Sequence, residues 1–385
     1  MRRWLMMVLS VITVWAEERA IDIVKPVSDK VELTYTIISS DDGLAKQIGE
    51  LVEFDFSALS TFLPKRVSAN EALLVLTATK EKGGVAIEVS YKGAKPFARG
   101  YKTDDANRYP FLVHRLAAEL SEHLTKNRPI WLEKPVLYAR YAGAGKSDIY
   151  VADYTFRYQR RVITGGMNIF PKWADQTGRS IYYTANEGRP ILYRADLYSG
   201  ERERILSSGG MTVCSDVSPD GSRLLVTMAP KGEPNIYLFE RERRKLTQLT
   251  TFRGIDVSAL FAPGEKIVMV SDRMGYPNIY TQKIGEERVE QVVFATKSNL
   301  QPRVYGTMLA YLSQDDGQSS IFLGDLGGHL GKRIATGGRV EWIDWSPDGK
   351  RLLALRESHV VVVDPVKGEY WALPTQLSGI QSLQW

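Results

Sequence analysis

The sequence predicts an α+β N-terminal domain followed by an all-β six-bladed β-propeller built from SPDG/WD40-like repeats. Three observations support this prediction: a repeat of about 44 residues fills the second half, the first part has no repeat, and the chain ends in a segment resembling the opening strand of a repeat. With 385 residues, of which 44% are hydrophobic and 25% charged, the chain can form a large core.

The N-terminus reads MRRWLMMVLSVITVWAEE. Arg2 and Arg3 precede an apolar run that ends at the small residue Ala16, which is typical of a secretory signal peptide. We expect residues 1–16 to be this peptide, with cleavage after Ala16; the alternative is an uncleaved anchor, for which the apolar run is short. The single cysteine, Cys214, allows no intramolecular disulfide and no lipidated N-terminus, so a periplasmic location is expected.

Residues 17–30 form an N-terminal arm in this prediction, and residues 31–130 form a small α/β domain. The expected elements of the domain are a strand in VELTYTII, a helix capped by Asp41 or Asp42, a hairpin turning at Gly83-Gly84, a strand in FARGYKT and a helix that starts at Asp104 or Asp105 and carries Leu112, Leu116, Leu120 and Leu124.

Residues 131–385 are predicted to form the propeller. Five blocks begin at Met167, Met211, Ile255, Asn299 and Arg339, and each block has four short strand patterns separated by turn residues. Two blocks carry the turn Ser-Pro-Asp-Gly, in which Asp220 and Asp348 can bond their own backbone and glycine takes the strained position. A lone four-stranded sheet cannot bury two apolar faces, whereas radial stacking of such sheets does.

The segment YAGAGKS ends like a phosphate-binding loop, but Arg140 stands where that motif needs its first glycine. An alternating strand pattern, not a helix, follows it. We therefore expect Gly143 to Ser147 to be a hairpin turn in a partial block that lacks its first strand. The last residues, GIQSLQW, resemble that missing strand and would close the ring of six blades.

A signal peptide, a small α/β domain and a propeller of SPDG repeats together resemble the TolB family of the Tol–Pal cell-envelope system over essentially the whole mature chain. The resemblance implies a non-enzymatic scaffold without cofactors that binds the lipoprotein Pal and signals to TolA. It also implies a role in outer-membrane integrity and in envelope constriction at cell division. A monomer, associated with the outer membrane only through Pal, is expected. After removal of Arg2 and Arg3 the net charge falls from +5 to +3, too mild to predict nucleic-acid binding.

Pal would dock where the loops that enter the first strands converge with the turns between second and third strands. The residues predicted for this mouth are Asn168, Met211, Thr212, Asp256, Val257, Arg273, Tyr276, Asn299 and Arg339. In the arm, Ile21, Asp22, Ile23, Val24 and Val27 would pair with the edge of a partner's sheet. Each mouth residue could instead be a solvated turn residue, and the arm could be a strand of its own domain.

A second hypothesis is a propeller enzyme or small-ligand sensor that uses the central channel, with Asp216 and Asp344 as its candidate carboxylates. The chain has no G-x-S-x-G motif, and its four histidines show no metal-ligand spacing. A propeller from outer-membrane protein assembly is a third, disfavoured hypothesis, because such proteins would carry a lipobox cysteine and no α/β domain.

Overall fold

The computed structural model describes residues 30–294, 298–315, 318–329, 331–334 and 338–385. The predicted signal peptide, its cleavage site at Ala16 and the arm residues Ile21 to Val27 lie outside the described residues. Within the described part, no helix is long and apolar enough to cross a membrane.

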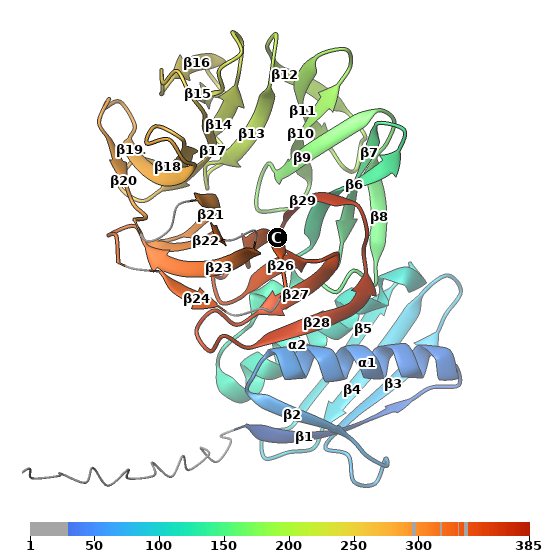
Figure 1. Ribbon diagram of the computed structural model, residues 1–385. Coiled ribbons are helices and arrows are strands. Elements are labelled where there is room, and N and C mark those ends of the chain that lie inside the picture. Colours follow the sequence, from blue (N-terminus) through green and yellow to red (C-terminus); the bar gives the residue numbers. More distant parts are fainter. Residues whose placement is uncertain (1–29, 295–297, 316–317, 330, 335–337) are drawn as a thin grey trace, which may run out of the picture.

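The N-terminal region is a five-stranded sheet covered on one side by two helices, as Figure 1 shows. Its elements are β1 (Val31–Ile38), α1 (Asp42–Ala58), β2 (Phe62–Arg66), β3 (Leu74–Lys80), β4 (Val85–Tyr91), β5 (Phe97–Thr103), the short 3₁₀ helix η1 (Ala106–Arg108) and α2 (Tyr109–Thr125). The strand order is β2-β1-β3-β4-β5. Strand β1 is parallel to both of its neighbours, and the other pairs are antiparallel. Strand β2 is an element that the sequence did not predict.

The helix and turn predictions are confirmed in all but one detail. The Asp41 carboxylate caps α1 by accepting a hydrogen bond from the Leu44 amide at 2.9 Å. The β3–β4 turn needs glycine, since a Cβ on Gly84 would lie 2.1 Å from the Thr103 carbonyl oxygen. Asp105, however, caps η1 and not α2. Helix α2 begins at Tyr109 without a side-chain cap, because η1 leads directly into it.

After the 3₁₀ helix η2 (Ile130–Glu133), every predicted repeat folds as an antiparallel sheet. Four sheets have four strands: β13–β16 (Thr212–Val217, Arg223–Met228, Asn235–Glu240, Lys245–Gln248), β17–β20 (Asp256–Ala262, Lys266–Ser271, Asn278–Lys283, Val289–Gln291), β21–β24 (Ser298–Tyr305, Met308–Asp315, Gln318–Asp325, Lys332–Ile334) and β25–β28 (Val340–Trp345, Leu352–Arg356, His359–Val363, Tyr370–Gln376). In Figure 1 the sheets radiate around the C-terminus.

The fifth sheet of the propeller has eight strands. It contains β6 (Val136–Gly143), β7 (Lys146–Ala152), β8 (Gln159–Ile163), β9 (Met167–Trp173), β10 (Ser180–Asn186), β11 (Pro190–Asp196), β12 (Arg202–Ser207) and β29 (Ile380–Gln384). The C-terminal strand β29 pairs with β6, as predicted, so the chain end supplies the strand that the first block lacks. A single bridge, Ser147 to Met167, joins β7 to β9. The predicted hairpin turn lies between β6 and β7, where Gly143, Ala144 and Gly145 all have positive φ.

The propeller has two ends, which we name by their turns. The SPDG end carries the turns between first and second strands and between third and fourth strands. The mouth end carries the other turns and the loops that enter each first strand. At the SPDG end, the Asp220 carboxylate accepts from the Ser222 amide at 3.1 Å and Asp348 accepts from the Lys350 amide at 3.2 Å, which confirms the predicted turn chemistry.

The helices of the N-terminal region pack against the SPDG end, and their core is continuous with that of the propeller. One cluster of buried side chains includes Phe56 of α1 and Leu116 of α2 together with Tyr154, Leu353 and Trp385 of the propeller. The two regions are therefore held by burial of apolar surface, not only by the chain that connects them.

Candidate partner-binding face of the propeller

The structure places all nine predicted mouth residues at the mouth end but divides them by exposure. Asn168, Thr212, Asp256 and Asn299 are buried, each with 2% or less of its surface exposed. Val257 and Arg273 are half-buried, and Met211, Tyr276 and Arg339 are exposed. A buried side chain cannot touch a partner unless the loops move, so this set contains two kinds of residue.

The buried residues bond to neighbouring strands and sheets. The Asn168 side-chain amide donates to the Ser147 carbonyl of β7 at 3.1 Å, and that of Asn299 donates to Asn278 Oδ1 of β19 at 3.1 Å. The Thr212 carbonyl accepts from the Thr184 hydroxyl of β10 at 2.8 Å. These bonds satisfy polar groups that the packing of adjacent sheets removes from water.

Asp256 forms a charged contact within its own sheet. Its carboxylate has no exposed surface and lies 3.1 Å from Nη2 of Arg273, in the turn between β18 and β19. The Arg273 guanidinium also lies over the rings of Phe252 and Tyr280, at 5.3 and 5.1 Å from their centroids. Arg273 thus stacks on aromatic rings at the mouth end, and the buried Asp256 carboxylate balances its charge.

The exposed residues are apolar to an unusual degree for turn positions. Tyr276 is 57% exposed and Met211 44%, and two residues that the sequence analysis did not select, Ile255 and Met274, are 44% and 73% exposed. Ile255 and Met274 belong to adjoining loops, because the Ile255 amide donates to the Asp272 carboxylate at 2.8 Å. Met274 stands in a turn whose equivalents, NEGRP, PKGEP and DDGQS, hold only polar residues at its position, and this was the signal that could have identified it. Together these four side chains define what we call the mouth patch.

Charged side chains from first strands of different sheets come close together, because Lys172 interacts electrostatically with Asp216, Arg303 and Asp344. By sheet register the six equivalent positions are Lys172, Asp216, Leu260, Arg303, Asp344 and Gln384. Two cations and two anions balance at this level, and the Arg303 guanidinium lies 3.0 Å from the Asp344 carboxylate. This ring of side chains, which we call the channel ring, therefore carries no net formal charge.

Both candidate channel carboxylates are engaged in closing the propeller. Asp216 accepts from the Phe261 amide of the next sheet at 2.9 Å, and Asp344 accepts from the Trp385 amide at 2.9 Å. Burial raises the pKa of Asp216 and lowers the pKa of Lys172. Each of these two carboxylates accepts a hydrogen bond from a backbone amide of a neighbouring strand, so both have a structural role.

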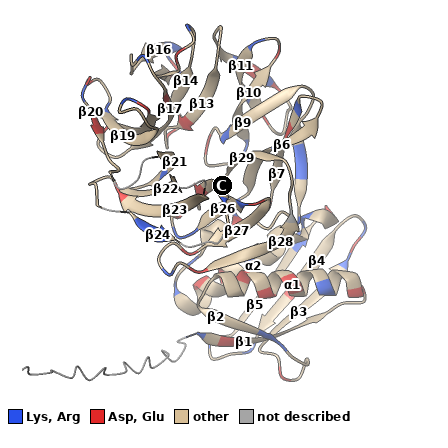
Figure 2. Ribbon diagram, in the orientation of Figure 1, with Lys and Arg blue, Asp and Glu red and all other residues tan. Residues whose placement is uncertain are grey.

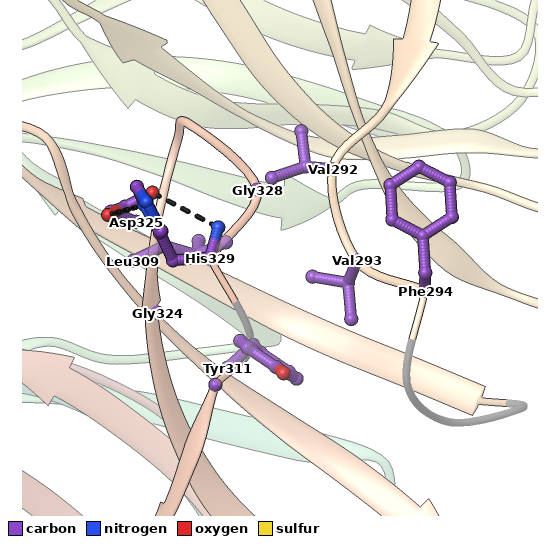
Figure 3. A pocket seen from close by; sticks show the side chains of 10 residues that line it. Val292, Val293, Phe294, Leu309, Tyr311, Gly324, Asp325, Gly328 and His329 are labelled. Carbon is purple, nitrogen blue, oxygen red and sulfur yellow. Dashed lines mark hydrogen bonds and ion pairs between the residues drawn. The ribbon is translucent and has the colours of Figure 1, made fainter.

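Figure 3 shows a small cavity beside β22 and β23, lined by Val292, Leu309 and Tyr311 with the Asp325–His329 ion pair at its rim. Its volume of about 20 Å³ has room for about one water molecule. Among the described residues, no group of three or more His, Cys, Asp or Glu side chains could hold a metal ion. In Figure 2, basic and acidic residues are interspersed over both regions.

The architecture defines a class of protein: a β-propeller with an α/β domain packed against the SPDG end of the strands β6–β8 and β25–β28. A family model described as "TolB beta propeller domain" matches residues 121–364. The chain belongs to the TolB family.

Its relatives agree with this over nearly the full length. The chain is 33% identical to the Tol-Pal system protein TolB of Campylobacter jejuni (strain RM1221) over 390 residues, covering 97% of each chain. It is 34% identical to the protein of that name from Wolinella succinogenes, covering 80% of this chain and 77% of the relative. The crystal structure of TolB from Acinetobacter baumannii superposes with a TM-score of 0.74 at 19% identity, over 93% of this chain and 97% of that one.

Proposed function

We propose that this chain is a periplasmic, non-enzymatic scaffold of the Tol–Pal system. In this proposal it binds Pal through the mouth patch and reaches TolA through residues 17–30, with Ile21, Asp22, Ile23, Val24 and Val27 pairing with a sheet edge. Residues 1–16 are the signal peptide in this proposal. Residues 31–130 and 131–385 are the two domains, and the eight-stranded sheet counts as two blades in a ring of six.

The mouth patch is the observation that carries the proposal. Met211, Ile255, Met274 and Tyr276 expose apolar surface on two adjacent sheets, at the end of the propeller that the N-terminal domain leaves open. Methionine and tyrosine are enriched at the centres of protein interfaces, and a flexible thioether adapts to a partner surface. Arg273, in the same turn as Met274 and Tyr276, adds positive charge beside this apolar surface.

Binding to Pal from the same organism tests the proposal. The chain beginning after Ala16 is titrated with the soluble part of Pal by calorimetry, as wild type, as the double variant Met274→Ala/Tyr276→Ala and as Tyr198→Ala. Tyr198 is 81% exposed but lies in the β11–β12 turn at the SPDG end, so it is a matched control for loss of an exposed tyrosine. We expect the double variant to lose tenfold or more in affinity, about 1.4 kcal/mol, and the control to lose none.

Two results would contradict the proposal. If the wild-type chain does not bind Pal, the Tol–Pal assignment describes ancestry and fold but not this interaction. If the double variant binds as tightly as the wild type while Tyr198→Ala binds less tightly, the docking face is at the SPDG end and the mouth patch serves another partner.

A further inference from the structure

A fully buried cluster of charged groups joins the two regions. His114 of α2 lies between two carboxylates: its Nδ1 is 2.7 Å from Asp55 of α1, and its Nε2 is 3.1 Å from Asp153, which follows β7 of the propeller. All three side chains have no exposed surface. The Tyr154 hydroxyl donates to the second oxygen of Asp55, so α1, α2 and the propeller meet at one imidazole.

The cluster satisfies its polar groups only when the imidazole is protonated. A carboxylate oxygen only accepts hydrogen bonds, and both ring nitrogens face such oxygens, so both nitrogens must donate. Asp153 is further held by the Thr155 amide at 2.8 Å and the Tyr158 amide at 2.5 Å. Burial alone would lower the pKa of His114, but Asp55 and Asp153 outweigh burial and raise the pKa to about 9.

The surrounding charges are already paired. Arg157, which follows Asp153, donates to Glu50 of α1 at 2.8 Å, and Tyr109 lies near it on α2. On the other side, Arg351 donates to the Ala58 carbonyl at the end of α1 at 2.9 Å and lies 3.1 Å from Asp364. Among the described residues, no other cation lies within ion-pair distance of Asp55 or Asp153, so the imidazolium is their counter-charge.

The chain end completes the cluster. The Trp385 ring stacks on Tyr154 with centroids 6.0 Å apart and meets Trp131 edge to face at 5.6 Å. The Trp385 amide also donates to Asp344 of the channel ring. Trp385, in the segment that closes the propeller, thus packs against Tyr154, which bonds Asp55. Closure of the ring and contact between the two regions therefore depend on the same side chains.

We propose that Asp55, His114 and Asp153 form a charge-dependent latch that fixes the α/β domain on the SPDG end of the propeller. With the imidazole protonated, each carboxylate has a charged donor and the domains hold one orientation. With the imidazole neutral, two buried carboxylates share one N–H, and the domain contact loosens at α1 and α2 while the sheets of each region stay folded. The latch rests on this geometry and not on the proposed partners.

The pH dependence has a definite sign. The folded-state pKa of His114, about 9, lies above its usual value of 6.5, so the protonated form favours the latched state. The contribution of the latch is complete below pH 6.5, falls as the pH rises above that value, and is lost once the pH has passed through about 9.

Distance measurements between spin labels test the latch in the chain beginning after Ala16. Labels at Lys46→Cys on α1 and Glu187→Cys at the mouth end use exposed positions, and Cys214 is buried with its pKa raised to about 12, so it stays unlabelled. We expect one narrow distance distribution at pH 6.5 that broadens as the pH passes 9. The variant His114→Gln should be broad at every pH. His123→Gln, on the same helix but bonded to the Lys95 carbonyl, should behave as wild type.

Circular dichroism at each pH distinguishes loosening from unfolding. A narrow distribution in His114→Gln, or a wild-type distribution unchanged up to pH 10, would overturn the latch. Global loss of structure by the wild type over the same pH interval would also overturn it, because the latch requires both regions to stay folded. If His114→Gln does not fold, the wild-type pH series decides the question alone.

Discussion

The two ends of the propeller carry the same kinds of turn residues and use charge in opposite ways. At the SPDG end, where the N-terminal region packs, buried charged side chains meet partners from another region of the chain, as His114 meets Asp55 and Asp153. At the mouth end, the buried carboxylate of Asp256 pairs with Arg273 of the same sheet, and apolar side chains such as Met274 and Tyr276 are exposed in the turns. The same repeat therefore forms a contact with the N-terminal region at one end and an exposed surface at the other.

The difference has an energetic consequence. Removing one member of a buried ion pair leaves an uncompensated charge without water, whereas removing an exposed side chain leaves its neighbours hydrated. Substitutions at the SPDG end should therefore change stability, and substitutions at the mouth patch should change binding. The predictions below test this contrast from the largest expected effect to the smallest.

The largest loss of stability is expected for Asp55→Ala. The change removes the acceptor of both the His114 imidazole and the Tyr154 hydroxyl in a site with no exposed surface. Breaking such a buried pair costs about 3–5 kcal/mol, which urea unfolding followed by tryptophan fluorescence would measure. Glu53→Ala, exposed on the same helix, is the control and should stay within about 0.5 kcal/mol of wild type. Equal effects of the two substitutions would mean that the cluster is not what holds the domains.

A smaller loss is expected for Asp256→Ala at the mouth end. The carboxylate is buried, but its partner Arg273 keeps 21% of its side-chain surface exposed and can turn to water. We expect a loss of about 1–3 kcal/mol in the free energy of unfolding, as for other buried hydrogen-bonding groups. Glu233→Ala, in an exposed turn nearby, should be neutral. If Asp256→Ala left the free energy of unfolding unchanged but weakened Pal binding, Asp256 would be a Pal-binding residue, as the sequence predicted.

The sequence was sufficient for what depends on local pattern. Strand alternation and turn residues predicted each four-stranded sheet, the hairpin at Gly143 to Ser147, and β29 as the strand that pairs with β6. These features depend on residues close in sequence, or on a repeat that shows which strand is missing. Short β2 was missed because Pro64 and two charged residues interrupt its alternation.

The sequence was not sufficient for what depends on contacts between distant segments. Block alignment placed Asn168 and Asn299 at the mouth, but only the stacking of sheets shows that the preceding sheet covers them. His114 showed no metal-ligand spacing, and its partners lie 59 and 39 residues away in the chain. No periodicity within α2 indicates that its histidine meets two carboxylates from other elements.

The smallest change in stability is expected for Tyr276→Ala, where the contrast between the two ends is sharpest. Tyr276 is 57% exposed in the turn between β18 and β19, so the free energy of unfolding should stay within about 0.5 kcal/mol of wild type. Affinity for Pal should nonetheless fall, because an exposed tyrosine beside methionine contributes mainly to complexes. Unfolding and binding measured on the same preparation separate the two effects. A destabilised Tyr276→Ala would show that the mouth patch supports the fold, and the functional difference between the two ends would then be one of degree.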